Sequence, residues 1–273
     1  MSSEPRFIDV HCGWGATPTA PNWSDDAQIR ATLKARGIGQ AFLASRPARL
    51  FDPVEGNDAL ARVVTENGGD DVDLKGWLVV NPARLSDAIA QMRQYLLGDL
   101  GERFVGAALY PDPHTGRPVT ARDAGDIVKV FLRYSRPLLI YTPNAAAMYE
   151  TVNIAQTFSG VKIIASGMGC DEWRESVMLA AKPTNLMLDV SGALCPEKID
   201  FAADALAGVR KLLFASGAPE TDPAAVISML FETELSAEDR GRILFGNAQR
   251  LFSLAEDETD DQIVLSAMSS LQP

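Results

Sequence analysis

The residue of this sequence best suited to acid–base or metal chemistry is His11, one of two histidines in the chain. An imidazole titrates near pH ~6.5, so it can act as a catalytic base, and in its neutral form it can bind a metal. Because side chains alternate along a strand, we expect Asp9, His11 and Gly13 to share one face. We interpret His11 as a buried histidine that is hydrogen-bonded to a neighbour such as Asp9. A catalytic base and a lone metal ligand are the alternatives.

Other polar and aromatic side chains stand at or just after the ends of short apolar runs, where parallel sheets collect functional groups. The three cysteines show no Cys-x-x-Cys spacing, so a thiolate metal site and a nucleophilic Cys12 are both disfavoured. We predict that the following residues line a pocket together with His11: Asp9, Cys12, Trp14, Tyr110, Tyr141, Ser166, Asp189 and Ser216.

Eight short apolar runs are the candidate strands that must position these side chains. They are Phe7–Val10, Ala41–Ala44, Gly76–Val80, Val105–Tyr110, Leu138–Tyr141, Lys162–Ala165, Asn185–Val190 and Lys211–Ala215. Amphipathic helical stripes separate them, and eight such units predict an α/β fold, a (β/α)₈ TIM barrel with its functional face at the carboxyl ends of the strands. A doubly wound open sheet is the alternative, but Gly13-Trp14-Gly15 lacks the third glycine of a dinucleotide-binding loop.

The composition limits the partners. The 273 residues carry a formal net charge of −11. An acidic protein repels phosphate, so we expect no nucleic acid and no membrane surface as partner, and a small molecule as the ligand. The sequence shows no signal peptide, no apolar run of ~18 residues and too few cysteines for a disulfide framework, so we expect a cytoplasmic protein.

Residues 1–254 are predicted to form a single barrel domain, because no change in composition marks a boundary within them. Residues 255–273 form an acidic C-terminal tail, in which a run of acids over 256–261 precedes apolar residues that could lie on one helical face. We interpret this segment as a solvated tail with a short helix. The alternative is a helix that docks on a partner subunit and makes the chain a homo-oligomer.

Several motifs resemble those of the amidohydrolase superfamily, in the amidohydrolase-related branch (family 2) that holds small decarboxylases and lactone hydrolases. The first run resembles the family's Ile-Asp-x-His-x-His motif, and Asn247-Ala248-Gln249-Arg250 resembles its terminal Asn-Ala-x-Arg motif. The resemblance extends over roughly residues 6–254 and implies an amidohydrolase-like TIM barrel with a metal-dependent hydrolase or decarboxylase site.

The same resemblance implies an altered metal site. Four positions that carry metal-binding or proton-handling side chains in the family are Gly13, Tyr141, Gly167 and Gly217 here, and His11 is kept. The family would use zinc or manganese, which needs about three protein ligands. We therefore expect no cofactor and a degenerate metal site, whose space is either filled by a neighbour such as Tyr141 or reshaped into a ligand pocket.

Three functions follow from these observations. The first is a catalytically altered family member, a pseudoenzyme that binds a small molecule or has a non-catalytic role. The second is a metal-independent hydrolase or lyase that uses His11 as acid or base. The third is an assembly subunit that contacts its partner through residues 255–273. We favour the first.

Overall fold

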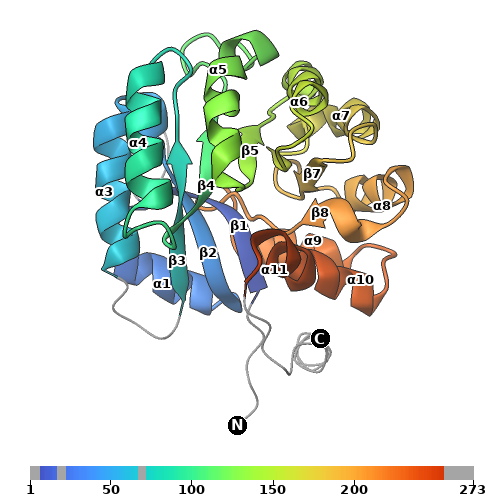
Figure 1. Cartoon of the computed structure of the whole chain (residues 1–273). Coiled ribbons are helices and arrows are strands. Elements are labelled where there is room, and N and C mark those ends of the chain that lie inside the picture. The colour runs from blue at the N-terminus through green and yellow to red at the C-terminus, as the bar shows by residue number, and fades with distance from the viewer. Residues whose placement is uncertain (1–6, 17–22, 67–71, 255–273) are drawn as a thin grey trace.

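The eight predicted strands form one parallel sheet that closes on itself (Figure 1). The computed structural model describes residues 7–16, 23–66 and 72–254. The strands, paired in chain order, are β1 Phe7–Trp14, β2 Ile38–Ser45, β3 Asp73–Val79, β4 Phe104–Leu109, β5 Leu138–Tyr141, β6 Ile163–Ser166, β7 Leu186–Asp189 and β8 Leu212–Leu213. The ring is completed where Val10 N donates to the carbonyl of Phe214 at 3.0 Å. The predicted (β/α)₈ barrel is confirmed.

Helices surround the barrel and follow the strands in alternation (Figure 1). They are α1 Asp26–Lys34, α2 Arg46–Leu50, α3 Pro53–Thr65, α4 Leu85–Leu97, α5 Ala121–Phe131, α6 Ala145–Thr157, α7 Trp173–Ala180, α8 Pro196–Ala205, α9 Pro223–Phe231, α10 Ala237–Gly241 and α11 Asn247–Phe252. Side-chain caps start several of them. Asp25 accepts from Gln28 N at the start of α1, and Asp222 accepts from Ala224 N just before the proline that opens α9.

Successive strand residues face two different apolar clusters. Phe42 and Val79 belong to the cluster inside the barrel, whereas their chain neighbours Leu43 and Leu78 belong to the cluster beneath the surrounding helices. Both faces of the sheet are therefore buried. This burial explains why the strands read as continuous apolar runs rather than as an alternation of apolar and polar residues.

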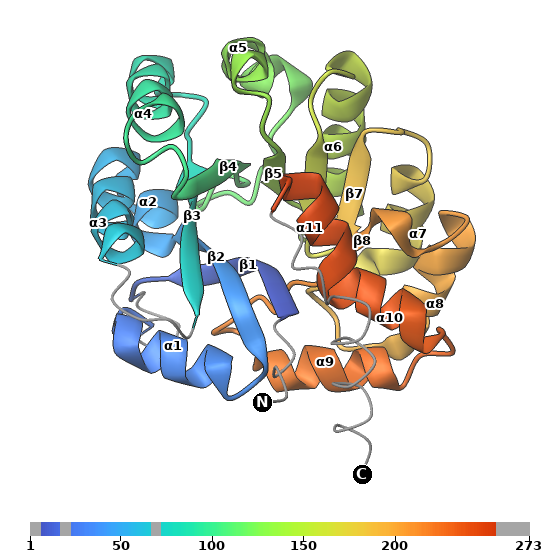
Figure 2. The same cartoon turned by 60° about the horizontal axis from the view of Figure 1, so that its bottom comes forward.

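The end of the barrel opposite the functional face is closed by aromatic side chains. Trp77 is fully buried, donates from Nε1 to the carbonyl of Val10 at 2.8 Å, and packs edge-on against Phe42 and Phe252. Phe252 comes from α11, which lies across the centre of the ring of strands in Figure 2. We call Phe42, Trp77 and Phe252 the barrel floor.

The predicted tail, residues 255–273, lies outside the described residues. In the part of the chain that the structure describes, no helix is both long and apolar enough to cross a membrane.

Candidate functional site

His11 lies at the carboxyl end of β1 and contacts two hydroxyl groups. Its Nδ1 is 2.6 Å from Ser166 Oγ at the end of β6, and its Nε2 is 2.8 Å from the Tyr110 hydroxyl just after β4. Asp189 Oδ2, at the end of β7, is 4.0 Å from Nδ1. Burial lowers the pKa of His11, and the nearby Asp189 carboxylate opposes that shift. The ring is therefore neutral at pH 7, with one nitrogen able to donate and the other to accept.

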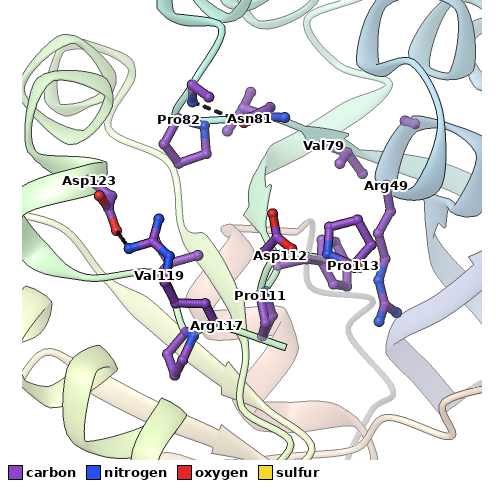
Figure 3. A pocket seen from close by; sticks show the side chains of 15 residues that line it. Arg49, Val79, Asn81, Pro82, Pro111, Asp112, Pro113, Arg117, Val119 and Asp123 are labelled. Carbon is purple, nitrogen blue, oxygen red and sulfur yellow. Dashed lines mark hydrogen bonds and ion pairs between the residues drawn. The ribbon is translucent and has the colours of Figure 1, made fainter. Parts of the chain in front are cut away.

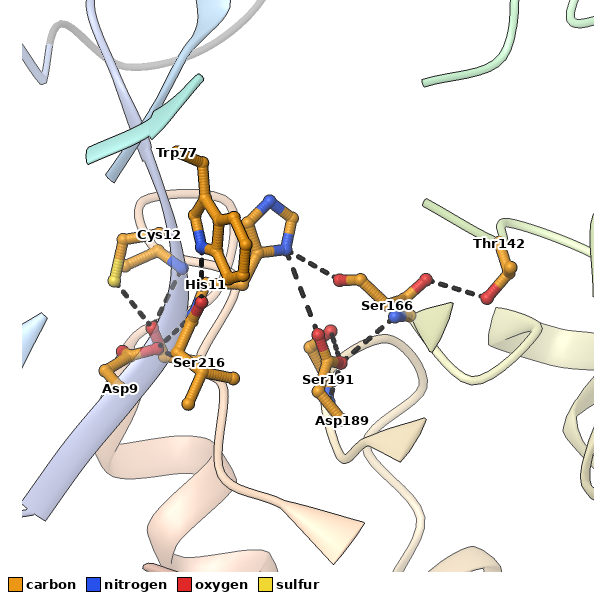
Figure 4. Close-up of polar contacts among 12 residues, drawn as sticks. Asp9, His11, Cys12, Trp77, Thr142, Ser166, Asp189, Ser191 and Ser216 are labelled. Carbon is orange, nitrogen blue, oxygen red and sulfur yellow. Dashed lines mark hydrogen bonds and ion pairs between the residues drawn. The ribbon is translucent and has the colours of Figure 1, made fainter. Parts of the chain in front are cut away.

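Asp189 is held beneath His11 by its own loop (Figure 4). Its Oδ1 accepts hydrogen bonds from Gly167 N at 3.0 Å, from Ser191 N at 3.1 Å and from the Ser191 hydroxyl at 2.5 Å. Its Oδ2 is buried and has no hydrogen-bond partner within the described residues. The carboxylate thus ties β6 to β7 through Oδ1 and presents Oδ2 toward the imidazole.

Asp9 lies away from the His11 ring, contrary to the expectation that the two would share a face. The register of β1 against β2 shifts between Asp9 and Cys12, so simple alternation fails there. In Figure 4, Asp9 lies next to Cys12 and Ser216 and away from the His11 ring. Asp9 Oδ1 accepts from Ser216 N at 3.0 Å and from His11 N at 3.3 Å, and burial raises the pKa of this carboxyl group to about 6. The group fastens β1 to the segment after β8.

A cavity of about 150 Å³ opens at the mouth of the barrel beside His11. Of the residues expected to line a pocket, His11, Tyr110 and Tyr141 do so. Six of the expected residues do not line it: Asp9, Cys12, Trp14, Ser166, Asp189 and Ser216. Ser166 and Asp189 lie behind His11 and contact Nδ1 of its ring, so they influence the cavity only through that ring.

Neighbouring side chains fill part of the space left by the glycines. A Cβ atom at Gly13 would lie 2.8 Å from Arg46 Nε, and one at Gly167 would lie 3.1 Å from the Tyr141 ring. At Gly217 the nearest such atom is the Cβ of Ser191, at 3.7 Å. Two of the three glycines therefore make room for Arg46 and Tyr141, and the third leaves space in the wall of the cavity.

Two arginines of the cavity lining, Arg46 and Arg49, were missed in the sequence. Arg46 donates from Nη1 to the carbonyl of Gly15 at 3.2 Å and pairs through Nη2 with Glu220 at 2.6 Å. Arg49 lies over the rings of Tyr110 and Tyr141, at 4.9 Å and 5.3 Å from their centroids. The two arginines stand three residues apart in α2, directly after a strand, and that spacing was the available signal.

Arg49 differs from Arg46 in its partners. Within the described residues its Nε is buried without a hydrogen-bond partner, and no ion pair to its guanidinium is found there. Leaving a buried charged donor unpaired costs about 1–3 kcal/mol or more. The stacking on two tyrosine rings offsets part of this cost. The Arg49 side chain lines the cavity.

Sequence comparison identifies the family. The family model described as Amidohydrolase matches residues 8–254. The chain belongs to the amidohydrolase family. The match confirms the resemblance drawn from the strand-end motifs, and it spans nearly the whole described barrel. A search of curated proteins finds no match.

Solved structures share the fold of this amidohydrolase. A dihydroxybenzoic acid decarboxylase from a Polaromonas species is 17% identical, with a TM-score of 0.72 over 93% of this chain and 98% of that chain. A 2,6-dihydroxybenzoate decarboxylase from Rhizobium is 15% identical, with a TM-score of 0.71 over 92% and 99%. A 5-carboxyvanillate decarboxylase from Novosphingobium aromaticivorans is 13% identical, with a TM-score of 0.70 over 92% and 96%. At these identities the likeness establishes the barrel fold.

These structures correct the expectation of no cofactor. The Polaromonas and Novosphingobium structures hold bound manganese. The expectation of no cofactor, which rested on Gly13, Tyr141, Gly167 and Gly217, is contradicted by these manganese-bound neighbours.

The side chains that the structure places at the mouth do not fit a divalent ion in their present arrangement. Within residues 7–16, 23–66 and 72–254, no group of three or more His, Cys, Asp or Glu side chains is suited to hold a metal. Both nitrogens of His11 contact hydroxyl groups, and the guanidinium of Arg46 takes up the space beside Gly13. The mouth of the barrel therefore presents a neutral imidazole, phenol hydroxyls and guanidinium groups.

Proposed function

We propose that this amidohydrolase binds a small organic anion, a carboxylate, in the cavity at the mouth of its barrel. The observation that carries the proposal is Arg49, whose side chain lines the cavity and forms no ion pair with any residue that the structure describes. A guanidinium offers a planar fork of donors that matches a carboxylate. The rings of Tyr110 and Tyr141 contact this guanidinium and position it at the cavity.

The charges around the cavity support a ligand with one negative charge. Arg46 and Glu220 compensate each other through their ion pair, and burial keeps His11 neutral at pH 7. Arg49 contributes the remaining positive charge of the lining. A carboxylate would neutralise it in a partly buried environment, where a charged hydrogen bond is stronger than at an open surface.

The size of the cavity and the ligands of the structural neighbours support an aromatic acid. The cavity measures about 150 Å³, and an engineered protein cavity of about that volume binds one benzene molecule. The Polaromonas structure holds 2-nitroresorcinol, and the Novosphingobium structure holds 4-hydroxy-3-methoxy-5-nitrobenzoic acid. A single substituted ring with a carboxylate matches both the volume and the charge.

Titration calorimetry with benzoate and with 2,6-dihydroxybenzoate tests this function. We expect Arg49→Gln to weaken binding of both acids by about 10–100-fold, the loss of a hydrogen bond between charged groups. Arg93→Gln, on the exposed side of α4, is the matched control and should bind as the unaltered chain does. Benzamide, the neutral analogue of benzoate, should bind weakly to every variant. Equal affinity of Arg49→Gln and the unaltered chain would contradict the proposal.

A hydrolase or lyase reaction that uses His11 as acid or base is the second candidate function. It is favoured by the Tyr110 hydroxyl, which lines the cavity and lies 2.8 Å from His11 Nε2. Through this contact a proton can pass between the imidazole and a bound molecule, with Tyr110 as the group that touches it. Ser166 on Nδ1 fixes the orientation of the ring.

The absorbance of 2,6-dihydroxybenzoate, followed with and without added manganese, tests for such a reaction. If turnover occurs, Tyr110→Phe and His11→Gln should each lower kcat by about 100-fold or more while changing the ligand affinity less. Turnover that survives His11→Gln unchanged would exclude His11 as the acid or base.

A further inference from the structure

A second, larger cavity of about 230 Å³ lies next to the first, between the loops after β3 and β4 and the helix α2 (Figure 3). Apolar side chains, several of them prolines, make up about half of its lining. The apolar members include Val79, Val80, Ala83, Pro111, Pro113 and Val119. We call this space the outer cavity and the one beside His11 the inner cavity.

The charged side chains of the outer cavity, apart from Arg49, bind to one another or to their own loop. Arg117 pairs with Asp123 at 2.9 Å. Asp112 Oδ1 accepts from His114 N at 3.1 Å, from Thr115 N at 2.8 Å and from the Thr115 hydroxyl at 2.8 Å. Arg117 is therefore paired with a carboxylate, and Arg49 is left as the cation of the outer cavity that can meet an anion.

Arg49 and Tyr110 line both cavities. A carboxylate at the donor edge of Arg49 would therefore lie at the boundary between the two spaces. From that position a ligand can extend along the valine and proline wall without displacing Arg46 or Glu220 from the inner cavity. The guanidinium of Arg49 beside the apolar wall of the outer cavity suits an acid that has an anionic end and an apolar end.

We propose that the outer cavity binds the apolar body of the ligand whose carboxylate contacts Arg49. The ligand class is accordingly the monocarboxylic acids that carry an extended alkyl or aryl substituent. This inference rests on the proposed anion binding at Arg49 and adds a second site, with a different specificity, to it. The outer cavity selects ligands by length and hydrophobicity, and Arg49 selects them by charge.

The test compares benzoate with 3-butylbenzoate and 4-butylbenzoate by titration calorimetry on the full chain. Each buried methylene strengthens binding by a factor of about 4, so partial burial of the butyl group should give at least one isomer an affinity gain of about 10–100-fold over benzoate. Ala83→Trp places a bulky ring on the exposed rim of the outer cavity and should remove most of that gain. It should weaken benzoate binding less than it weakens binding of the butyl isomers.

Pro113→Phe, on another exposed part of the same lining, is the second variant and should act in the same way as Ala83→Trp. If benzoate binds through Arg49 but neither butyl isomer binds more tightly, the outer cavity is not part of the site and the anion-binding function stands. A gain that both rim variants leave intact would place the butyl group elsewhere and overturn the inference. If none of the acids binds, the anion-binding function itself fails.

Discussion

The two ends of this barrel are stabilised by different interactions. At the barrel floor, Phe42, Trp77 and Phe252 fill the interior with aromatic rings that pack edge-on. At the mouth, His11 contacts hydroxyl groups from two other strands, and a cavity remains open beside it. The floor excludes water and gains stability from packing. The mouth is less tightly packed and carries polar groups that can bind a ligand, as in other barrels of this kind.

The largest effect on stability is expected when an aromatic ring is removed from the barrel floor. Trp77→Ala should lower the free energy of unfolding by about 3–5 kcal/mol, because it leaves a cavity in a close-packed interior. It also removes the donor to the Val10 carbonyl. Denaturant unfolding measures the change. Phe51→Ala, at a side chain that is 70% exposed, is the control and should change stability by less than about 0.5 kcal/mol. A small effect of Trp77→Ala would show that the floor is loosely packed.

A second test uses Lys198, which is fully buried behind the mouth and donates from Nζ to the Ser191 carbonyl at 2.8 Å. Burial lowers its pKa from 10.5 to about 8. Between pH 8 and 10.5 the unfolded chain therefore binds more protons at this lysine than the folded chain, so the lysine makes stability rise with pH across that window. The rise from this one group should be about 3 kcal/mol.

Lys198→Met keeps the shape of the side chain and removes its titration. Below pH 8 the lysine is charged in the folded and the unfolded chain, and the folded chain carries the full cost of burying that charge. The variant has no such charge, so its free energy of unfolding should lack the rise between pH 8 and pH 10. Denaturant unfolding of both proteins at each pH isolates the contribution of this lysine from those of other groups. Parallel curves would show that Lys198 titrates normally in the folded chain.

A smaller effect is expected at the polar contacts of the mouth. Tyr110→Phe removes the hydroxyl that contacts His11 Nε2 and should cost about 1 kcal/mol, the net value of one hydrogen bond. Thermal unfolding at pH 7 measures it. Tyr134→Phe is a matched control, because the Tyr134 hydroxyl is buried without a hydrogen-bond partner in the described structure. If the two changes cost the same, the contact between Tyr110 and His11 contributes nothing to stability.

The smallest effect is expected at the rim of the outer cavity. Arg117→Gln breaks the pair with Asp123, but the Arg117 side chain is 64% exposed. Exposed ion pairs contribute about 0–1 kcal/mol, and salt screens them, so stability should fall by no more than about 0.5 kcal/mol. Benzoate affinity should not change. A tenfold loss of benzoate affinity would mean that Arg117, rather than Arg49, meets the carboxylate.

The fold could be predicted from the sequence because each strand is buried on both faces. The run Leu138–Tyr141 coincides with β5, and the other seven runs overlap the remaining strands. The last strand is shorter than the run Lys211–Ala215 that predicted it. There the chain leaves the pairing with β7, and Phe214 N donates instead to the carbonyl of Ile243.

The site could be predicted only in part. His11, Tyr110 and Tyr141 were found because strand ends meet at one edge of a barrel. Alternation along β1 placed Asp9 beside His11, and the shift in register moved it away from the His11 ring. Arg46 and Arg49 lie in the short helix α2, where charged side chains ordinarily face solvent. Their orientation toward the mouth depends on the space at Gly13 and on the tyrosine rings, which come from segments distant in the sequence.

The most direct test of the anion-binding site is a crystal structure with 4-bromobenzoate, whose bromine is located by its anomalous scattering. We predict the carboxylate within hydrogen-bonding distance of the Arg49 guanidinium, and the position of the bromine then shows which of the two cavities holds the ring. A carboxylate bound at any other group, with the Arg49 guanidinium left without an anion, would contradict the account.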